Sequence, residues 1–540
     1  MVMNIKKALF PYIPTWVLKI YHRIRFLTPQ KRIHNQTSNN IVSNKKILLD
    51  KTILKEKNID AVKVIRYLAW QNPFIKNDYG KYQYKEETFN IKKNTEITME
   101  FNNYGFWTLE IFYYCKGKTV TEETKTINIE ASEYNIAYLA ATLPVLLFLS
   151  YMWKISKKDS PTLVLLERIL FDYNKLPENV FPFPLASKIE LNTQYKGFEH
   201  SAQRMVSYIG MLYKMNPEAK FNLYLCDHQA YYILAFMYAN GIPEDNFTVN
   251  LLSDGTASYD CFRYIFDADD AEKIYSNMQQ TWKLAKQEAR KTGPKEWGYE
   301  AFTHCGNPCV RKRARSKSLV EQFANRSAYS YVMTNENKNF ELVLHDVSML
   351  QGNPAILDKM TERVHNIDFD DCKKLLNNHS SELCKMIGLD GNLFESSYKS
   401  GKKICILLGR FPFSEDDYKY INKTMSFFGR DYDYYIKDHP WGFSDEKRKE
   451  TLKKRGIPSL NPKIPTEIYM MLDPSVYIAG YLSSSFLSIG LLDNPNEQIL
   501  SIWNSKERTI KTNCLDFVAK TAMNIEKNTV MVYDEVSDEE

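Results

Sequence analysis

The chain has 540 residues, and its 71 Lys and Arg against 65 Asp and Glu give a formal net charge of +6. A protein of this size that coats DNA or RNA usually carries a larger basic excess, so no nucleic-acid partner is expected. The content of 44% hydrophobic and 25% charged residues is typical of globular proteins and excludes a disordered chain. The length predicts about three domains, each large enough to bury a core.

The basic excess lies at the N-terminus, where residues 1–49 hold nine Lys or Arg and no acidic residue. The stretch 16–27 interleaves apolar and aromatic residues with Lys and Arg, as in helices that lie on anionic lipid. A helix docked on the next domain would show the same pattern. We predict an amphipathic extension and linker over residues 1–43, with peripheral contact to an anionic membrane through residues 1–35.

The next part of the chain, residues 44–132, alternates apolar and polar side chains. Ile97, Met99 and Phe101 alternate with polar neighbours, and the pattern repeats from Trp107 to Tyr113. Turn-like sequences separate these runs. We predict a small antiparallel β-sandwich of immunoglobulin-like size.

Residues 136–153 form an uncharged run of 18 residues, which reaches the lower limit for a membrane-spanning helix. Pro144 divides this run into a strand-like and a helix-like part, and a second apolar run follows at 161–171. Strand, turn, helix and strand is the opening of a Rossmann-type unit, whose strands are buried on both faces. We favour this βαβ interpretation over a transmembrane helix.

Apolar strand-like runs alternate with helical stretches through the rest of the chain. The runs 221–227 and 247–255 flank a helix, and residues 404–409 begin a second series after a break near 397–402. This alternation predicts an α/β fold with two Rossmann-like domains that face a cleft. We place them at 133–398 and 399–515, followed by a C-terminal helix and acidic tail at 516–540.

The nine cysteines are scattered from Cys115 to Cys514 and do not form the framework of a secreted, disulfide-bonded protein. A reducing cytoplasm fits this distribution best. Cys305 and Cys309, with His304 beside them, form the one close pair. Because no second pair completes a zinc site, we predict a loop with free thiols and no metal there.

Three short polar sequences each follow a buried-looking strand, which is where open α/β sheets place their ligands. The first is Asp254-Gly255-Thr256. The glycine allows close approach to the carboxylate, which can accept a proton from a substrate hydroxyl. An ordinary Asp-Gly turn is the alternative.

The second sequence is Lys437-Asp438-His439-Pro440, in which the proline holds His439 in an extended conformation. A histidine in this position can donate to a phosphate oxygen, and a plain polar loop is the alternative. The third sequence is Ser483-Ser484-Ser485, at a strand-to-helix junction. Its hydroxyl and N–H groups suit either a phosphate cradle or a helix N-cap.

In this order and spacing, the three motifs resemble those of bacterial sialyltransferases of the GT-B type, which have two facing Rossmann-like domains. Capsule polysialyltransferases and marine and pasteurellal sialyltransferases carry acidic-acidic-Gly, Lys-x-His-Pro and Ser-Ser motifs. Thr142 lies at the place of their Thr-Pro loop, and Glu467 lies in a Pro-Thr-Glu-Ile sequence before the last strand. Some relatives also have an N-terminal immunoglobulin-like domain.

The resemblance implies an inverting transfer of sialic acid from CMP-sialic acid to a sugar hydroxyl, with Asp254 as the base. His439 would hydrogen-bond or protonate the departing phosphate. No metal or other cofactor is implied, because hydrogen bonds and positioning can stabilise a leaving group that is already a phosphate anion. The other donor-side residues are Ser484 and Ser485 at the phosphate, Glu467 at the ribose, Lys437 and Asp438 beside the cytosine, and Gly409, Pro440 and Ser483. The acceptor-side residues are Gly255, Thr256 and Thr142.

The sequence departs from the family pattern at Ser253, which stands at the first acidic position of the first motif. Asp254 is then the base, unless an acid from elsewhere fills that role. The Asp-x-Asp sequences at 267–269 and 368–370 match a metal motif of other glycosyltransferases, but we expect them on the solvated surface. The basic cluster 311–315 is expected on a helix face, with binding of an anionic acceptor glycan as the alternative.

The leading hypothesis is a sialyltransferase that builds a bacterial surface polysaccharide or lipooligosaccharide at the cytoplasmic face of the inner membrane. Its partners would be a nucleotide sugar and a glycan acceptor. One alternative keeps the fold and uses another donor, CMP-Kdo or a UDP-sugar. Another is a catalytically silent protein for glycan binding or assembly.

Overall fold

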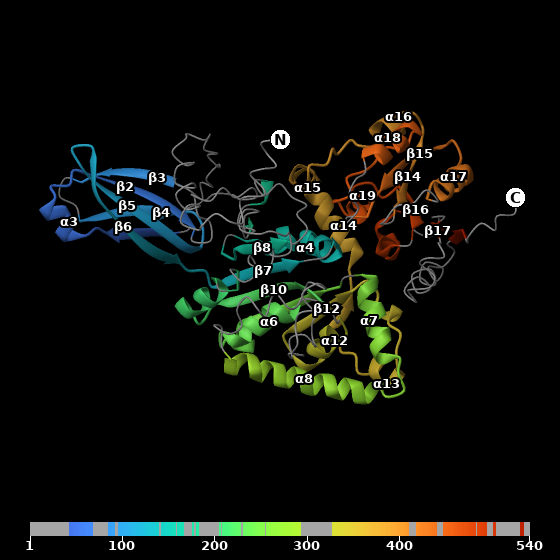
Figure 1. Ribbon diagram of the computed structural model, residues 1–540, viewed down its shortest axis with the longest axis horizontal. Coiled ribbons are helices and arrows are strands. Elements are labelled where there is room, and N and C mark those ends of the chain that lie inside the picture. Colours follow the sequence, from blue (N-terminus) through green and yellow to red (C-terminus); the bar gives the residue numbers. More distant parts are fainter. Residues whose placement is uncertain are drawn as a thin grey trace, which may run out of the picture.

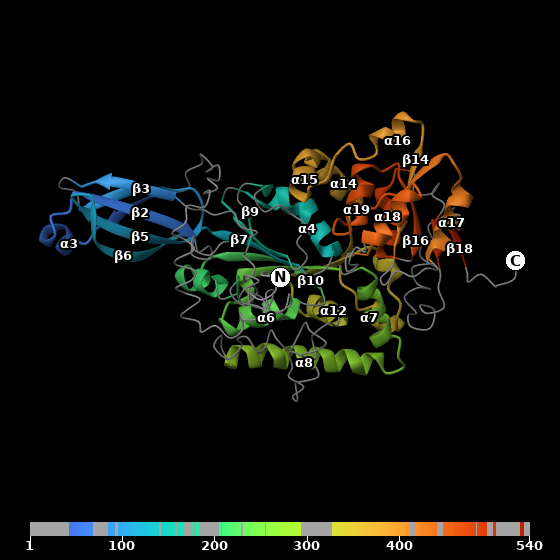
Figure 2. The same ribbon diagram turned by 45° about the horizontal axis from the view of Figure 1, so that its top comes forward.

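The computed structural model contains a β unit, drawn in blue at the left of Figures 1 and 2, and two α/β domains (Figure 1). The structure describes residues 43–68, 85–91, 95–139, 142–157, 159–166, 175–177, 180–182, 205–206, 208–227, 230–253, 255–292, 327–409, 417–439, 446–481, 483–493, 500–503 and 530–533.

The β unit consists of a two-stranded sheet, β1–β4, and a four-stranded sheet in the order β3-β2-β5-β6, and all of its strands are antiparallel. The alternation predicted from the sequence is confirmed, because Met99, Phe101 and Leu109 are buried in a core that both sheets share. The elements are β1 (Ser43–Leu48), α3 (Lys51–Glu56), β2 (Ala61–Leu68), β3 (Lys85–Asn90), β4 (Glu96–Phe101), β5 (Gly105–Cys115) and β6 (Lys118–Ile129).

The first α/β domain has a seven-stranded parallel sheet in the order β13-β12-β11-β10-β7-β8-β9. The chain runs from β7 outward to β9 and then returns to β10 on the other side of β7. This reversal is the switch point of a doubly wound sheet, beside which ligands bind at the carboxyl ends of the strands. The strands are β7 (Glu133–Leu139), β8 (Thr162–Leu166), β9 (Val180–Pro182), β10 (Lys220–Cys226), β11 (Phe247–Leu252), β12 (Phe340–Leu344) and β13 (Val364–Asn366).

Helices connect and cover these strands, and the long helix α8 lies at the bottom of Figure 1. The helices are α4 (Thr142–Ile155), α6 (Ala230–Ala239), η3 (Glu244–Asn246), α7 (Thr256–Phe266), α8 (Ala271–Thr292), α12 (Ser327–Glu336), η4 (Val347–Met349), α13 (Pro354–Leu357), α14 (Phe369–Asn378) and α15 (Ser380–Ile387). Helix α16 (Glu395–Lys399) follows them and contacts β14 (Lys403–Leu408) of the second domain.

The uncharged run 136–153 forms a strand and a helix, as predicted. It contributes most of β7 and α4, and β8 pairs with β7 in parallel. Pro144 lies in the first turn of α4, where a missing N–H costs no helical hydrogen bond. Across the described part of the chain, no helix combines the length and apolarity needed to cross a membrane.

The second α/β domain has a five-stranded parallel sheet in the order β15-β14-β16-β17-β18. The chain passes from β14 to β15 on one side and then returns to β16 on the other side of β14. The switch point of this sheet therefore lies between β14 and β16. The elements are β14 (Lys403–Leu408), α17 (Asp417–Phe428), β15 (Tyr432–Lys437), α18 (Glu446–Lys454), α19 (Thr466–Leu472), β16 (Tyr477–Tyr481), η5 (Ser484–Leu491), β17 (Leu500–Trp503) and β18 (Val530–Tyr533).

The predicted boundary after residue 515 needs correction. Strand β18 lies in the segment 516–540, for which a helix and tail were predicted, and pairs in parallel with β17. A four-residue apolar run near the end of a chain gives too weak a pattern to predict a strand. The backbone groups of β18 bond to the edge of β17, and the local sequence of β18 does not reveal this partner.

The two α/β domains pack closely through α14, whose residues contact α4 of the first domain and α19 and η5 of the second. Buried side chains of both domains form one continuous core. Lys373 on α14 also forms an ion pair with Asp493, with 2.9 Å between Nζ and Oδ1. This packing brings the carboxyl edge of one sheet against that of the other.

Gly480 allows β16 to approach β14 closely. It has φ of +121°, and a Cβ at this position would lie 2.6 Å from the Leu408 amide nitrogen. We expect Gly480→Ala to lower the free energy of unfolding by about 3 kcal/mol, because the strand backbones must separate. Chemical denaturation measures this change.

Gly456→Ala is the matched control. Gly456 also has a positive φ, of +78°, but no atom lies within 4 Å of a Cβ there. It should cost about 1 kcal/mol, which is the price of the backbone conformation alone. Equal losses in the two variants would show that the contact with Leu408 is not the constraint.

Candidate functional site

The three sequence motifs lie at the carboxyl ends of the parallel strands, as predicted. Gly255 follows β11, His439 follows β15 and Ser483 follows β16. The side chains of Asp254, Thr256, Pro440 and Thr142 lie outside the described residues, although Thr256 begins α7 and Thr142 begins α4. The described members of each motif therefore share one edge of their sheets.

Gly255 and Ser484 bring the two domains into contact. Gly255 has φ of +74° and ψ of −131°, and a Cβ there would lie 2.9 Å from Cβ of Ser484. Such a backbone conformation is accessible essentially only to glycine. The acidic-Gly motif and the serine motif thus face each other directly, and glycine is needed for both the turn and the contact.

The serine motif begins the 3₁₀ helix η5. Ser483 caps this helix, and its hydroxyl accepts a hydrogen bond from the Ser485 backbone N–H at 3.3 Å. The cap leaves the hydroxyl group of Ser484, which is half-buried, at the junction between the domains. Both predicted readings of this motif are compatible, since a capped helix start also presents N–H groups to an anion.

Lys437, Glu467 and Ser485 form a buried polar cluster behind this junction. Burial raises the pKa of Glu467, while a bond from its own backbone N–H, a bond from the Ser485 hydroxyl and the charge of Lys437 oppose the rise. Burial lowers the pKa of Lys437 to about 8, against the attraction of Glu467 and Asp438. The cluster links the second motif to the third.

Lys437 is buried at the end of β15. Its side chain is 4% exposed, and its ammonium donates to the backbone oxygens of Asp438 at 2.9 Å and Pro462 at 3.0 Å. Lys437 therefore stabilises the loop after β15 through these two backbone oxygens. A buried ammonium must find such acceptors, and the local sequence gives no sign of the 462 loop that supplies one.

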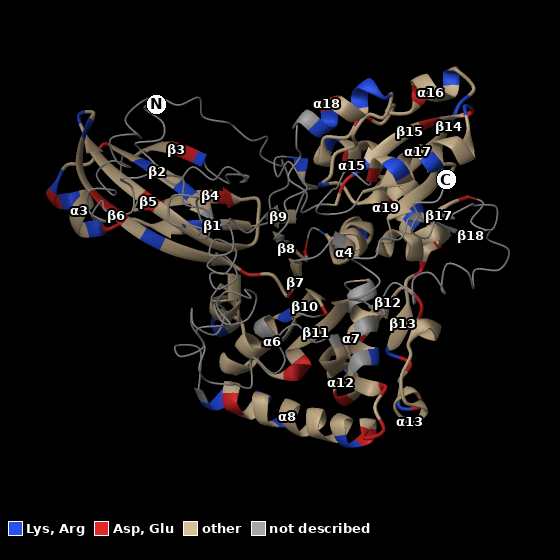
Figure 3. Cartoon of the chain, turned by 45° about the vertical axis from the view of Figure 1, so that its right-hand side comes forward, with Lys and Arg blue, Asp and Glu red and all other residues tan. Residues whose placement is uncertain are grey.

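Asp438 and Gly409 lie side by side at the ends of β15 and β14. A Cβ at Gly409 would lie 2.6 Å from Oδ1 of Asp438, so only glycine leaves room for this carboxylate. Asp438 forms a buried ion pair with Arg448 of α18, a helix rich in Lys and Arg (Figure 3). Arg448 was not predicted from the sequence, because nothing distinguishes it from the other basic residues of α18.

His439 is exposed at the same edge, directly after Asp438. The two residues before it, Lys437 and Asp438, are buried.

His345 is a residue of the junction that the sequence analysis missed. It follows β12, is 4% exposed, and its Cε1 would lie 3.7 Å from a Cβ on Gly255. Its Nε2 lies 3.4 Å from the Ser488 hydroxyl of the second domain. Burial lowers the pKa of His345 to about 4, so the ring is neutral at physiological pH. Its place after the apolar strand 340–344 was the available signal.

The two Asp-x-Asp sequences, which were expected on the solvated surface, have structural explanations. Asp267 and Asp269 are exposed at the end of α7. Asp368 caps α14 by accepting from the Asp371 backbone N–H at 2.8 Å. Over the described part of the chain, no cluster of three or more His, Cys, Asp or Glu suits a metal ion. The thiols Cys305 and Cys309, His304 and the basic cluster 311–315 lie outside the described residues.

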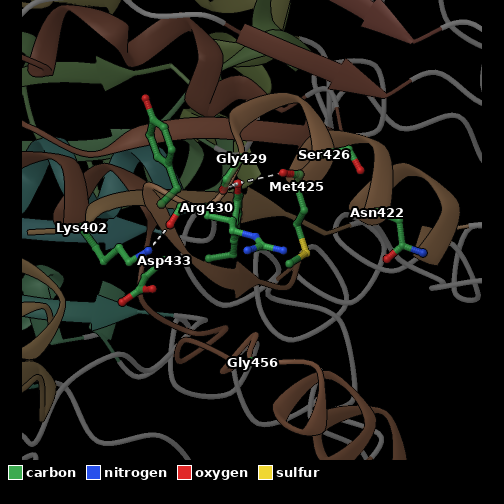
Figure 4. A pocket seen from close by; sticks show the side chains of 10 residues that line it. Lys402, Asn422, Met425, Ser426, Gly429, Arg430, Asp433 and Gly456 are labelled. Carbon is green, nitrogen blue, oxygen red and sulfur yellow. Dashed lines mark hydrogen bonds between the residues drawn. The ribbon is translucent and has the colours of Figure 1, made fainter. Parts of the chain in front are cut away.

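A pocket of about 830 Å³ lies elsewhere on the second domain (Figure 4). Its lining includes Lys402 and Arg430, just before the starts of β14 and β15, and Gly456, just after α18. The motifs that follow β15 and β16 lie at the opposite edge of the same sheet. Because Lys402 donates to the backbone oxygen of Arg430, its ammonium is already engaged.

Comparisons with known proteins give matches in structure only. No family model matches the sequence, and no curated protein matches it. A sialyltransferase from Photobacterium damsela covers 92% of this chain and 98% of its own, with a TM-score of 0.52 at 13% identity. A structure of residues forming the GT-B domain of a Photobacterium damselae sialyltransferase covers 74% of this chain and 100% of its own, with a TM-score of 0.52 at 15% identity. The chain has the GT-B fold.

A third solved structure extends the likeness. The 2,6-sialyltransferase of Photobacterium sp. JT-ISH-224, in a ternary complex with CMP and lactose, covers 91% of this chain and 94% of its own. Its TM-score is 0.53 at 12% identity. The predicted pair of Rossmann-like domains of GT-B type is therefore confirmed.

The buried His345 predicts a pH dependence of stability. The unfolded chain takes up a proton on this side chain near pH 6.5, while the folded chain does so only near pH 4. The stability contributed by neutral His345 is thus fully present above pH 6.5 and is lost as the pH falls to 4. We expect a loss of up to about 3 kcal/mol from this residue.

Measurement of unfolding free energies from pH 7 to pH 4, for wild type and His345→Asn, checks this expectation. Asparagine can still bond Ser488 but does not titrate, so its curve should be flatter. Parallel curves for the two proteins would contradict a buried, neutral His345.

Proposed function

We propose that the chain is an inverting glycosyltransferase that moves sialic acid from CMP-sialic acid to a glycan hydroxyl. The contact between Gly255 and Ser484 carries this proposal, because it joins the acceptor-side motif to the donor-side motif within a GT-B fold. The fold is shared with sialyltransferases, one of them solved with CMP and lactose. A nucleotide sugar and a glycan are thus the proposed partners.

Asp254 is the proposed general base, which removes the proton of the acceptor hydroxyl as that oxygen attacks the anomeric carbon. The bond from this carbon to the CMP phosphate breaks, and the electron pair leaves on the phosphate. The exposed His439 donates a hydrogen bond or a proton to the phosphate oxygen that receives this electron pair. Ser484 and Ser485 stabilise the other phosphate oxygens, and Glu467 lies toward the ribose. Positioned donors of this kind lower the barrier most when charge develops on the leaving group.

The structure changes the proposed roles of two residues. Lys437 and Asp438 are buried and bonded to Pro462 and Arg448, respectively. We propose that they hold the loop that carries His439, with the cytosine lying against this loop. Thr142, Gly255 and Thr256 lie on the acceptor side, and Gly409 leaves space for the Asp438 carboxylate.

The β unit and the cellular site belong to the same proposal. We propose that the β unit is an immunoglobulin-like β-sandwich; its use for contact with a partner belongs to the alternative of a catalytically silent assembly protein. Synthesis of a capsule polysaccharide or lipooligosaccharide would take place at the cytoplasmic face of a bacterial inner membrane. A mechanism without a metal is also proposed, since the leaving phosphate already carries negative charge.

A donor screen that detects released CMP or UDP, with lactose as acceptor, tests the reaction. We expect CMP release from CMP-sialic acid, unchanged by EDTA, and a loss of about 10³-fold in kcat/KM for Asp254→Ala because the base is removed. Asp269→Ala, which removes an exposed acid, is the matched control and should retain wild-type activity.

Other outcomes would separate the alternatives. Full activity in Asp254→Ala would exclude this residue as the base. Release of UDP from a UDP-sugar, or of CMP from CMP-Kdo only, would favour another donor on the same fold. No turnover together with no binding of CMP would favour a silent glycan-binding or assembly protein.

Membrane contact through residues 1–35 has a separate test. We expect the full chain to float with anionic liposomes and a chain without residues 1–40 to stay in solution, since each basic residue near such a surface contributes about 1 kcal/mol. Equal flotation of the two forms would contradict a membrane role for the extension.

A further inference from the structure

A directed chain of hydrogen bonds connects the backbone of the acidic-Gly turn to a buried carboxylate. The Gly255 N–H donates to the Ser253 hydroxyl at 3.1 Å, and this hydroxyl donates to the Ser258 hydroxyl at 3.0 Å. Ser258 in turn donates to Oδ2 of Asp227 at 2.6 Å. In these described bonds, each hydroxyl accepts from one group and donates its only proton to the next.

Asp227, at the far end of this series of hydrogen bonds, is itself held in place by backbone hydrogen bonds. Asp227 follows β10, is 3% exposed, and its backbone N–H donates to the Leu252 oxygen at the end of β11. Its backbone oxygen accepts a bond from the Ser330 hydroxyl at 2.5 Å. Elements β10, β11 and α12 thus fix the position of Asp227 independently of its bond to Ser258.

The Asp227 carboxylate can only accept, so it sets the direction of these hydrogen bonds and strengthens them. A hydrogen bond to an ionised oxygen is about twice as strong as one between neutral groups, and successive bonds polarise one another. Ser253 and Ser258 are also buried, with 0% and 4% exposure, so water does not replace a missing partner. The bond between the Gly255 N–H and the Ser253 hydroxyl therefore depends on a carboxylate one strand away.

Ser253 is the position at which this sequence departs from the acidic-acidic-Gly pattern. Its hydroxyl is neutral, yet it is joined through Ser258 to a carboxylate on the neighbouring strand. A buried carboxylate is thus present at this edge of the sheet, but it comes from Asp227 after β10 and not from position 253.

We propose that Asp227 is a positioning residue for the reaction, which acts through Ser258 and Ser253 to hold the turn that carries Asp254. The inference rests on the proposed transferase function, because it assigns Asp254 as the group to be positioned. Asp227 touches neither substrate in this account. Its effect is on the placement of the base, where an error of about 1 Å can cost about 100-fold in rate.

Two serines bonded to Asp227 provide a matched comparison. Ser258→Ala removes the hydroxyl that links Asp227 to the turn, while Ser330→Ala removes a buried hydroxyl that bonds only the backbone oxygen of Asp227 among the bonds described. Both variants lose one buried hydroxyl. A merely structural role predicts similar effects of the two substitutions, whereas the positioning role predicts that only Ser258→Ala affects the turn.

The experiment combines steady-state kinetics with hydrogen exchange on the full chain. For Ser258→Ala we expect kcat to fall by about 10- to 100-fold with the KM for CMP-sialic acid within about twofold, because the donor-side residues are untouched. The Gly255 amide should exchange at least about fivefold faster, since its acceptor loses its own partner. Ser330→Ala should stay within about threefold of wild type in kcat and should leave this amide unchanged.

Asp227→Asn is the second variant, which keeps an oxygen able to accept from Ser258 but removes the charge. We expect a smaller fall in kcat, of about 10-fold, with an unchanged KM for the donor. Equal effects of Ser258→Ala and Ser330→Ala on kcat and on the Gly255 amide would overturn the proposal. If the wild type transfers no sugar, the proposed function fails, and the exchange of the Gly255 amide still decides whether Asp227 holds the turn.

Discussion

The contact between Gly255 and Ser484 is the constraint on which the proposed site depends. It sets the distance between the carboxyl edges of two parallel sheets, and any side chain at position 255 would force these edges apart. Helix α14 stabilises the same arrangement by packing on elements of both domains. Gly255 and the serine motif therefore lie against each other, although about 230 residues separate them along the chain.

The electrostatics of this junction oppose its stability. Lys437, Asp438, Glu467, Asp227 and His345 are all buried, and burial of ionisable groups costs free energy unless each finds partners. Partners are supplied by backbone oxygens for Lys437, by Arg448 for Asp438 and by Ser258 for Asp227. Polar groups held in fixed positions are also what a reaction with a developing charge requires. The concentration of buried polar residues at one edge thus supports a catalytic site there.

The sequence predicted those features that depend on local patterns. Alternation gave the strands of the β unit, and the proline in the run 136–153 separated a strand from a helix. Each motif follows a buried strand because the order of apolar run and polar turn is written in adjacent residues. Because the strands are parallel, the turns that follow them lie at the carboxyl edge of each sheet, where open α/β sheets bind ligands.

Other features depend on contacts between distant segments and were missed for that reason. His345 meets Ser488 across 143 residues, and Arg448 is one basic residue among several on α18. The burial of Lys437 depends on a carbonyl of Pro462, 25 residues further on. Strand β18 forms because β17 offers an edge, which a four-residue run cannot reveal.

The location of nucleotide binding tests the central claim most directly. Hydrogen exchange of the full chain with and without CMP reports which backbone segments the ligand protects. We predict protection at 437–439, 466–468 and 483–485, at the carboxyl edge of the second sheet. Protection instead around Lys402 and Arg430, at the pocket on the opposite edge, or no protection by either CMP or UDP, would contradict the account.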